Sequence, residues 1–205
     1  MSRKRCSMYT AARLECEMRP DILTFTGQYF DFLTPSPESI TIEAIAHALA
    51  NTCRFGGHTS SFYSVAEHSV RVARSRYVPS WLKFDALMHD AAEAFVGDIP
   101  SPLKRILPDF KLIEARVEDA IEARFGCHEM HHPLVKNADL VLLATEQRDL
   151  MPSHDDEWAS IRGIQPLRAR IRPLTPRRAE RAFLQAFSRY APLEMAPMAE
   201  MEIAA

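Results

Sequence analysis

The chain has 205 residues, of which 47% are hydrophobic and 25% charged, and its formal net charge at pH 7 is -2. This length suits one domain with a sizeable core, and the weak net charge excludes a global basic field of the kind that recruits nucleic acid. No segment approaches the roughly 20 uninterrupted apolar residues of a membrane span, and the four cysteines form no CxxC pair, so we expect a cytoplasmic protein with no membrane partner.

The front of the chain predicts an arm and a small hairpin. The first twenty residues, 1–20, lack a periodic pattern and are interpreted as a loosely held arm. Residues 22–25 and 28–32 are rich in aromatic and β-branched side chains and flank Thr26 and Gly27, which is typical of a short β-hairpin. Since a lone hairpin is marginal in water, we expect it to lie on a helical body.

From residue 42 onward the apolar residues recur at helical spacing. Ser80 is the expected N-cap of the third predicted helix and Gly126 the expected C-cap of the fourth. Residues 191–205 lack a strong pattern and are interpreted as a disordered tail. The sequence therefore predicts an all-α domain over residues 21–190 with a small N-terminal β-hairpin. Its helices are expected over residues 42–52, 61–76, 81–95, 109–125, 134–150 and 177–190.

Four polar residues occupy positions in these helices where apolar ones would be expected. His89 and Asp90 lie in the middle of the helix predicted over residues 81–95, where adjacent side chains are about 100° apart and can converge on one ion. Asp139 lies in a helix that is apolar on most sides, where an ionised carboxylate is costly unless it is paired or bound to a metal. His68 also lies within a helix. Two imidazoles and two carboxylates form a mixed set of nitrogen and oxygen donors that suits Mn, Co, Fe, Zn or Ni.

Residue chemistry alone leaves structural alternatives open. A single histidine within a helix is usually hydrogen-bonded in a core or on a surface, and Asp139 could pair with an arginine. Arg54 could complement a helix dipole, Asp98 could cap a following helix, and Lys104 could be a plain surface charge. Glu93 could simply hydrogen-bond a ligand histidine. A metal site and a set of buried ion pairs are therefore both compatible with the pattern.

A second group of histidines, made of His128, His131 and His132, invites a second metal site. Only Glu129 offers a carboxylate at matching spacing. We therefore interpret this segment as a solvated loop.

The candidate residues follow one another in a fixed order on consecutive predicted helices, namely Arg54, His68, His89, Asp90 and Asp139. Residues 89–104 read HDAAEAFVGDIPSPLK. This order resembles the HD-domain phosphohydrolases, and the segment is similar to the HDxxExxxGDxPxPxK signature of bacterial 5'-deoxynucleotidases. Residues 54–69 read RFGGHTSSFYSVAEHS, which resembles phage HD enzymes that strip triphosphate from dATP. The resemblance covers roughly residues 22–150 and implies an HD-domain helical bundle.

The resemblance implies a metal site and proton-transfer groups. One divalent metal, with Mg less suited than Co, Mn, Zn, Fe or Ni, would lower the pKa of a bound water and polarise the phosphoryl group. Glu93 and Asp98 would orient the attacking water or move protons. The expected metal ligands are His68, His89, Asp90 and Asp139.

The resemblance also implies contacts with the substrate. Arg54 would grip phosphate with its planar fork, and Lys104 would neutralise phosphate charge. His58 would contact the phosphate chain. Phe55 stands where the deoxynucleotidases carry a tryptophan near the sugar, so it is expected to line the substrate site.

We therefore expect a metal-dependent phosphohydrolase acting on 5'-(deoxy)nucleotides. It would release phosphate from a deoxynucleoside monophosphate, or triphosphate from a deoxynucleoside triphosphate such as dATP. The alternatives are an HD phosphodiesterase or phosphatase acting on other signalling nucleotides, a non-catalytic metal-containing nucleotide sensor, and a helical interaction module with buried ion pairs. The resemblance also implies a homo-oligomer, a dimer or larger, and no specific nucleic-acid partner.

Overall fold

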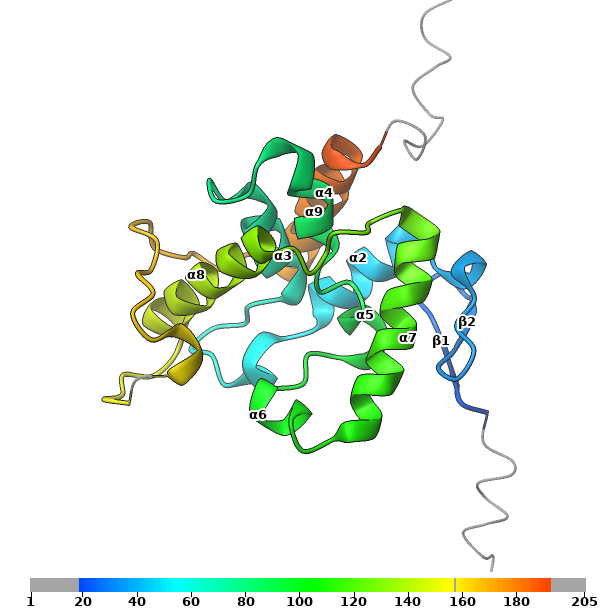
Figure 1. The fold of residues 1–205 in the computed structure, drawn as a ribbon, viewed down its shortest axis with the longest axis horizontal. Coiled ribbons are helices and arrows are strands. Elements are labelled where there is room, and N and C mark those ends of the chain that lie inside the picture. Colours follow the sequence, from blue (N-terminus) through cyan, green and yellow to red (C-terminus); the bar gives the residue numbers. More distant parts are fainter. Residues whose placement is uncertain (1–18, 157, 193–205) are drawn as a thin grey trace, which may run out of the picture.

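A computed structural model describes residues 19–156 and 158–192. Nearly all of the expected arm at residues 1–20, and most of the expected tail at residues 191–205, therefore lie outside the described residues. Within the described part the protein is mostly helical, with one small sheet near the front, as the sequence predicts (Figure 1). None of the helices in these ranges is long and apolar enough to cross a membrane.

The predicted hairpin is confirmed, with shorter strands than expected. Strands β1 (Asp21–Leu23) and β2 (Tyr29–Asp31) pair antiparallel. Gly27 in the turn has a φ of 78°, in the left-handed region that favours glycine. Phe30 of β2 is fully buried and stacks on Phe95, with the ring centroids 4.0 Å apart. This contact fastens the hairpin to the helical body.

The body is built around one central helix. Helix α3 (Val65–Arg74) contacts α2 (Ile42–Asn51), α4 (Lys83–Met88) and α9 (Pro176–Tyr190), and it also contacts α8 (Pro133–Leu150) (Figure 1). Eight of the ten residues of α3 are buried. A helix that is enclosed on nearly every side must supply buried partners for each polar side chain it carries.

Helix α3 begins at Val65, later than the predicted start at residue 61, because of its cap. The Ser64 hydroxyl accepts a hydrogen bond from the Glu67 backbone N–H at 3.2 Å, which satisfies one of the free donors of the first turn. The side chain of Glu67 makes separate contacts. Its carboxylate accepts hydrogen bonds from Arg71 Nε at 2.9 Å and from the Leu174 backbone N–H at 2.7 Å. The cap therefore fixes where the first full turn of α3 lies.

The prediction of one continuous helix over residues 81–95 is wrong. A short 3-10 turn at Ser80–Leu82 leads into α4, which ends at Met88. Residues 89–92 form a tight turn, and the chain then enters the short helix α5 (Glu93–Val96). The pair His89 and Asp90 therefore lies in a turn between two helices.

Periodicity could not reveal this break, because the turn keeps nearly helical backbone angles. His89 has φ and ψ of -58° and -31°, and Ala92 has -60° and -28°. The local hydrogen bonds span three residues, as in the bond from the Glu93 N–H to the Asp90 carbonyl at 3.1 Å. The apolar residues therefore continue at helical spacing across a tightened segment.

One of the two expected caps is confirmed and the other is wrong. Ser80 is the first residue of its 3-10 turn, while Pro79 occupies the cap position and makes no side-chain capping bond. At the end of α7 (Pro108–Phe125), Gly126 has φ and ψ of 65° and 28° and donates its N–H to the Glu122 carbonyl at 2.7 Å. The left-handed conformation at this position explains the glycine.

The long connection between α8 and α9 is tied to the end of α8 by one carboxylate. Asp149 accepts hydrogen bonds from Arg148 Nε at 2.7 Å, Arg170 Nη1 at 2.8 Å and the Ile171 backbone N–H at 2.8 Å. Its side chain is only 2% exposed.

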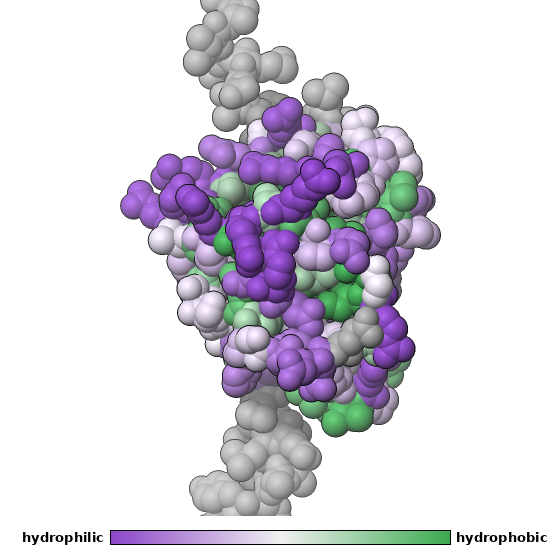
Figure 2. Space-filling view, turned by 90° about the vertical axis from the view of Figure 1, so that its left-hand side faces the viewer, coloured by the Kyte–Doolittle hydropathy of each residue, from purple (hydrophilic) through white to green (hydrophobic). Residues whose placement is uncertain are grey.

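Seen from the side of α8, the surface is mostly hydrophilic, with small hydrophobic areas between polar side chains (Figure 2).

We predict that Asp149→Asn makes the free energy of unfolding less dependent on pH in acid. Burial raises the pKa of Asp149, but the hydrogen bonds from Arg148, Ile171 and Arg170 outweigh it and lower the pKa to about 2. A carboxyl with a lowered folded-state pKa stabilises the fold above its unfolded pKa, and this contribution is lost as the pH falls through the folded value. The expected contribution, on the order of 2 kcal/mol, is lost between about pH 5 and pH 2.

Urea denaturation at pH 6, 4 and 3 measures this effect. The stability difference between the wild type and Asp149→Asn should shrink as the pH falls, while Asp156→Asn, at an exposed position in the same connection, should show no such trend. A difference that stays constant from pH 6 to pH 3 would contradict the assigned role of Asp149.

Candidate metal centre

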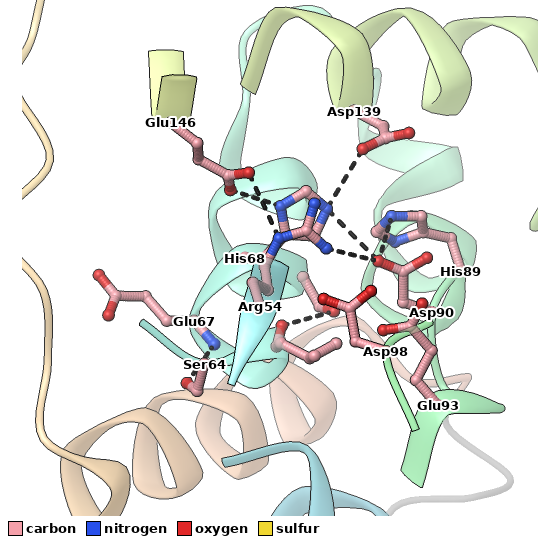
Figure 3. Close-up of polar contacts among 12 residues, drawn as sticks. Arg54, Ser64, Glu67, His68, His89, Asp90, Glu93, Asp98, Asp139 and Glu146 are labelled. Atoms are coloured by element: carbon pink, nitrogen blue, oxygen red, sulfur yellow. Dashed lines mark hydrogen bonds and ion pairs between the residues drawn. The ribbon is translucent and has the colours of Figure 1, made fainter. Parts of the chain in front are cut away.

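Three distant segments bring a histidine–histidine–aspartate cluster together. His68 comes from α3, His89 from the turn after α4, and Asp139 from α8 (Figure 3). Each offers one ligand atom, and these atoms lie within 4.8 Å of one another. The His68 Nε2 atom is 3.3 Å from Asp139 Oδ1. Distances of this order between nitrogen and oxygen donors are compatible with a shared metal ion.

Asp90 lies beside this cluster and completes the set of predicted ligands. Its Oδ2 atom is 3.4 Å from His68 Nε2, 3.3 Å from His89 Nε2 and 3.4 Å from Arg54 Nη1. Burial raises the pKa of Asp90, but the charges of His89, His68 and Arg54 outweigh it and lower the pKa. An ionised carboxylate is therefore favoured between the two imidazoles.

Both imidazoles are oriented by a partner at Nδ1. The His68 Nδ1 atom is 2.6 Å from Glu146 Oε1, and the His89 Nδ1 atom is 3.0 Å from the Ala86 carbonyl oxygen. Both acceptors favour the tautomer with the proton on Nδ1, which leaves the lone pair on Nε2. Each Nε2 is buried and has no hydrogen-bond partner. Two such nitrogens facing carboxylates fit a metal ion better than a network of ordinary hydrogen bonds.

The carboxylates favour positive charge at the cluster. Burial and the Arg54 guanidinium lower the pKa of His68, but Glu146 and Asp139 outweigh them and raise it to about 10. Burial above all lowers the pKa of His89. Burial would raise the pKa of Asp139, but the nearby imidazole of His68, and then the charges of His89 and Lys136, hold the pKa well below its usual range.

Sequence reasoning missed Glu146, which is fully buried in α8. Its Oε1 atom holds His68, and its Oε2 atom is 3.3 Å from Arg54 Nε, so one carboxylate orients both a candidate ligand and the buried arginine (Figure 3). The sequence did contain a signal for Glu146, because this residue follows Asp139 by seven positions in the same apolar helix. Residues separated by two turns lie on one face, so the reasoning applied to Asp139 also applied here.

Glu93 and Asp98 lie close to the cluster and both favour the protonated form. Burial raises the pKa of Glu93 well above its usual range, and the charges of Asp90 and Asp98 add to the effect. Burial also raises the pKa of Asp98. Asp98 does not cap the helix α6 (Ser101–Lys104), because its Oδ2 atom accepts the Phe55 backbone N–H at 3.2 Å.

The segment that carries Arg54 contains a strained residue. Phe55 has φ and ψ of 56° and 29°, and within the described residues it is the one non-glycine residue with a positive φ. Such a conformation costs on the order of 1–3 kcal/mol and persists only where its surroundings impose it. The bond from its N–H to Asp98 imposes it here. The Phe55 ring lies 6.0 Å from that of Trp158, a residue that sequence reasoning did not single out.

The remaining predicted site residues, Lys104 and His58, differ in how close they lie to the cluster. Lys104 is partly buried, with Nζ 2.6 Å from Glu114 Oε1 and 3.5 Å from Glu93 Oε1, so it is not a plain surface charge. His58 is exposed, and no hydrogen bond or ion pair described for residues 19–156 and 158–192 joins its imidazole to the cluster. The predicted contact of His58 with the phosphate chain therefore stays a prediction.

The three loop histidines do not form a metal site among the described residues. The side chains of His128 and His131 are 68% and 74% exposed, and each faces one carboxylate of α7. His132 caps α8 by accepting the Leu134 backbone N–H at 3.1 Å. Within the described part of the chain, the one group of three close ligand side chains contains His68, His89 and Asp139.

We predict that Glu146→Gln weakens metal binding by about 10- to 100-fold, the usual effect of removing a carboxylate that orients a ligand histidine. The substitution keeps the side-chain shape and removes the charge that holds His68. Calorimetric titration of the full-length chain with Mn²⁺ measures the affinity. Glu129→Gln, in the exposed loop before α8, is the matched control and should bind like the wild type. Equal affinity in Glu146→Gln would rule out this orienting role.

Comparison with known proteins places the chain among bacterial relatives. No family model matches it. YfdR of Escherichia coli K12, an uncharacterized protein, is 42% identical over 168 residues, which span 82% of this chain and 93% of YfdR. An uncharacterized protein of Rhodobacter capsulatus is 33% identical over 167 residues, which span 72% of this chain and 85% of that protein. At this identity and coverage, the chain belongs to the YfdR family.

Proposed function

We propose that this protein is an HD-domain, metal-dependent phosphohydrolase that acts on 5'-(deoxy)nucleotides. The observation that carries the proposal is the pair of buried Nε2 atoms of His68 and His89, which make no hydrogen bond and face the carboxylates of Asp90 and Asp139 at 3.3–3.4 Å. Buried polar atoms in proteins are nearly always hydrogen-bonded, and a shared metal ion would satisfy both nitrogens. The segment at residues 89–104 supports a nucleotide substrate by its resemblance to the deoxynucleotidase signature.

The four side chains would hold one divalent ion through nitrogen and oxygen donors. When bound, such an ion lowers the pKa of a coordinated water and polarises a phosphoryl oxygen. The donor set suits Mn, Co, Fe, Zn or Ni. Glu146 fixes the orientation of His68, and the Ala86 carbonyl fixes that of His89, so the two nitrogens are aimed before any ion arrives.

Arg54 would bind the phosphate. Its side chain is 10% exposed, and the guanidinium lies 3.4 Å from Asp90 Oδ2, with Nε 3.3 Å from Glu146 Oε2. The fixed fork of a guanidinium matches two oxygens of a phosphate. Because Glu146 and Asp90 already restrain it, the side chain loses little freedom when a phosphate binds.

Glu93 and Asp98 supply the proton transfers. The raised pKa of the buried Glu93 carboxyl favours its protonated form, which suits a general acid that protonates the leaving oxygen. Asp98 is held by the Phe55 N–H and orients the attacking water or accepts its proton. Two acids with different surroundings can divide these roles.

We predict that the purified full-length chain hydrolyses one class of nucleotide in the presence of Mn²⁺ or Co²⁺. The panel comprises the deoxynucleoside monophosphates and triphosphates and their ribonucleotide counterparts, with product analysis to separate release of phosphate from release of triphosphate. Asp90→Ala should abolish turnover and weaken metal binding, because it removes a ligand. Glu93→Gln should retain the metal and lower kcat by about 10²- to 10⁴-fold, the range expected for loss of a proton-transfer group.

The outcomes separate the candidate functions. Turnover that is lost in Asp90→Ala supports the hydrolase. Metal binding without turnover across the whole panel would refute it and favour a nucleotide sensor or an unrelated phosphoester. Absence of metal binding, with no stabilisation by added metal, would indicate a helical interaction module.

A further inference from the structure

Arginine is concentrated in one short stretch of the chain, far from the residues of the metal cluster in sequence. Residues 168–181 contain six arginines, no lysine and one acidic residue, Glu180, although the formal net charge of the whole chain is -2. These arginines lie on the connection before α9 and on the first two turns of that helix. All six are exposed and together form the arginine surface, namely Arg168, Arg170, Arg172, Arg177, Arg178 and Arg181.

Most of these cations have no partner of opposite charge within residues 19–156 and 158–192. Arg170 pairs with Asp149 at 2.8 Å, and the carboxylate of Glu180 lies 3.5 Å from His47 Nδ1. The other five side chains make no hydrogen bond or ion pair with these residues, namely those of Arg168, Arg172, Arg177, Arg178 and Arg181. Five guanidinium groups are therefore open to an anionic partner.

The backbone of the connection is held in place beneath these arginines. Ile171 is buried, and its N–H donates to the Asp149 carboxylate at 2.8 Å. The Leu174 N–H donates to a carboxylate of α3 at 2.7 Å, and the Arg172 carbonyl oxygen accepts from Arg71 Nη2 at 3.3 Å. A surface that is fixed before binding loses less conformational freedom when a partner arrives. Figure 2 shows the side that carries this connection, where strongly hydrophilic side chains gather.

The arginine surface continues onto the exposed face of α9. Arg181 is four residues after Arg177 and three after Arg178, so both pairs place like charges side by side on the helix. Such pairs destabilise a helix, and a bound anion would relieve their repulsion. A groove along this face is lined by Arg177, Glu180, Arg181, Leu184, Gln185 and Ser188.

The residue types favour a partner that carries several phosphates. The planar guanidinium of arginine matches two oxygens of one phosphate, a geometry that lysine does not offer. The six arginines are spread over two elements and 14 residues of the chain. A single phosphate would contact only a few of them, whereas a chain of phosphates can pair with them all.

Nucleic acids and anionic membranes both present repeated phosphates, and the arginine surface fits the first better. A helix that lies on a membrane combines cations with large apolar side chains that enter the lipid. No large hydrophobic side chain among residues 158–192 is exposed, so this apolar anchor is missing. A single strand also adapts to an irregular surface, while duplex DNA is stiff over about 150 base pairs.

We propose that the arginine surface binds the phosphate backbone of a single-stranded nucleic acid. Contacts to phosphates carry no sequence information, so this binding does not depend on the base sequence. The inference goes beyond the proposed function and does not rest on it, because no residue of the arginine surface belongs to the candidate metal centre.

The salt dependence of oligonucleotide binding tests the proposal. The probe is a fluorescein-labelled single-stranded DNA of mixed sequence, about 20 nucleotides long, bound to the full-length protein in EDTA and followed by fluorescence anisotropy. Each phosphate neutralised on a single strand contributes roughly -0.7 to the slope of log K against log[KCl]. Contacts from the five unpaired arginines should therefore give a slope of about -3.5.

The triple variant Arg172→Gln/Arg177→Gln/Arg181→Gln should lose three of these contacts. Its slope should be less steep by about 2, and its affinity at 0.1 M KCl should fall by about 100-fold, since each contact contributes roughly 5-fold at this salt concentration. The matched control Arg105→Gln/Lys111→Gln/Arg116→Gln removes the same charge from exposed positions around α6 and α7 and should bind like the wild type. Both variants should bind Mn²⁺ as the wild type does.

Three results would overturn the proposal. The first is absence of salt-dependent binding of the oligonucleotide by the wild type at low salt. The second is an equal loss of affinity in the two triple variants, which would reflect net charge alone. The third is binding to phosphatidylserine vesicles without binding to the oligonucleotide, which would assign the arginine surface to a membrane. Because the binding assay contains no metal and measures no turnover, its outcome is independent of the hydrolase test.

Discussion

The burial of the His68 imidazole within α3 is the constraint on which the rest of the centre depends. A polar ring enclosed on every side needs partners at both nitrogens. Glu146 supplies one at 2.6 Å, while the other nitrogen faces Asp90 and Asp139 without a hydrogen bond. Each buried carboxylate in turn needs positive charge nearby, which Arg54 provides for Glu146 and Asp90. The site is therefore a closed set of mutual requirements around the Nε2 position of His68.

Local backbone geometry sets the directions of the side chains around that position. The tight turn at residues 89–92 carries both His89 and Asp90, whose Nε2 and Oδ2 atoms lie 3.3 Å apart. On the opposite side, Phe55 adopts a strained conformation whose N–H is held by Asp98. Strain of this kind is commonly found at functional sites, where the surrounding structure maintains it. Both irregular segments border the same cluster.

Charge divides the surroundings of the centre into two sides. Arg54 offers a buried cation restrained by two carboxylates. A cavity of about 250 Å³ on the other side is lined by Glu93, Glu114 and Glu118, and both lysines that line it, Lys104 and Lys136, are paired with carboxylates. An anionic group is therefore better accommodated on the side of Arg54 than in the cavity.

The sequence alone determined the helical class and the front hairpin and singled out the residues of the candidate metal cluster, because these depend on local periodicity and on polar residues placed in apolar stretches. The sequence did not predict the break after Met88, because a tightened turn keeps the apolar residues at helical spacing. The role of Glu146 was decided by the tertiary structure. A carboxylate becomes an orienting partner only when distant helices pack, and packing of α3 against α8 creates the contact between Glu146 and His68. Long-range contacts of this kind leave no periodic signal along the chain.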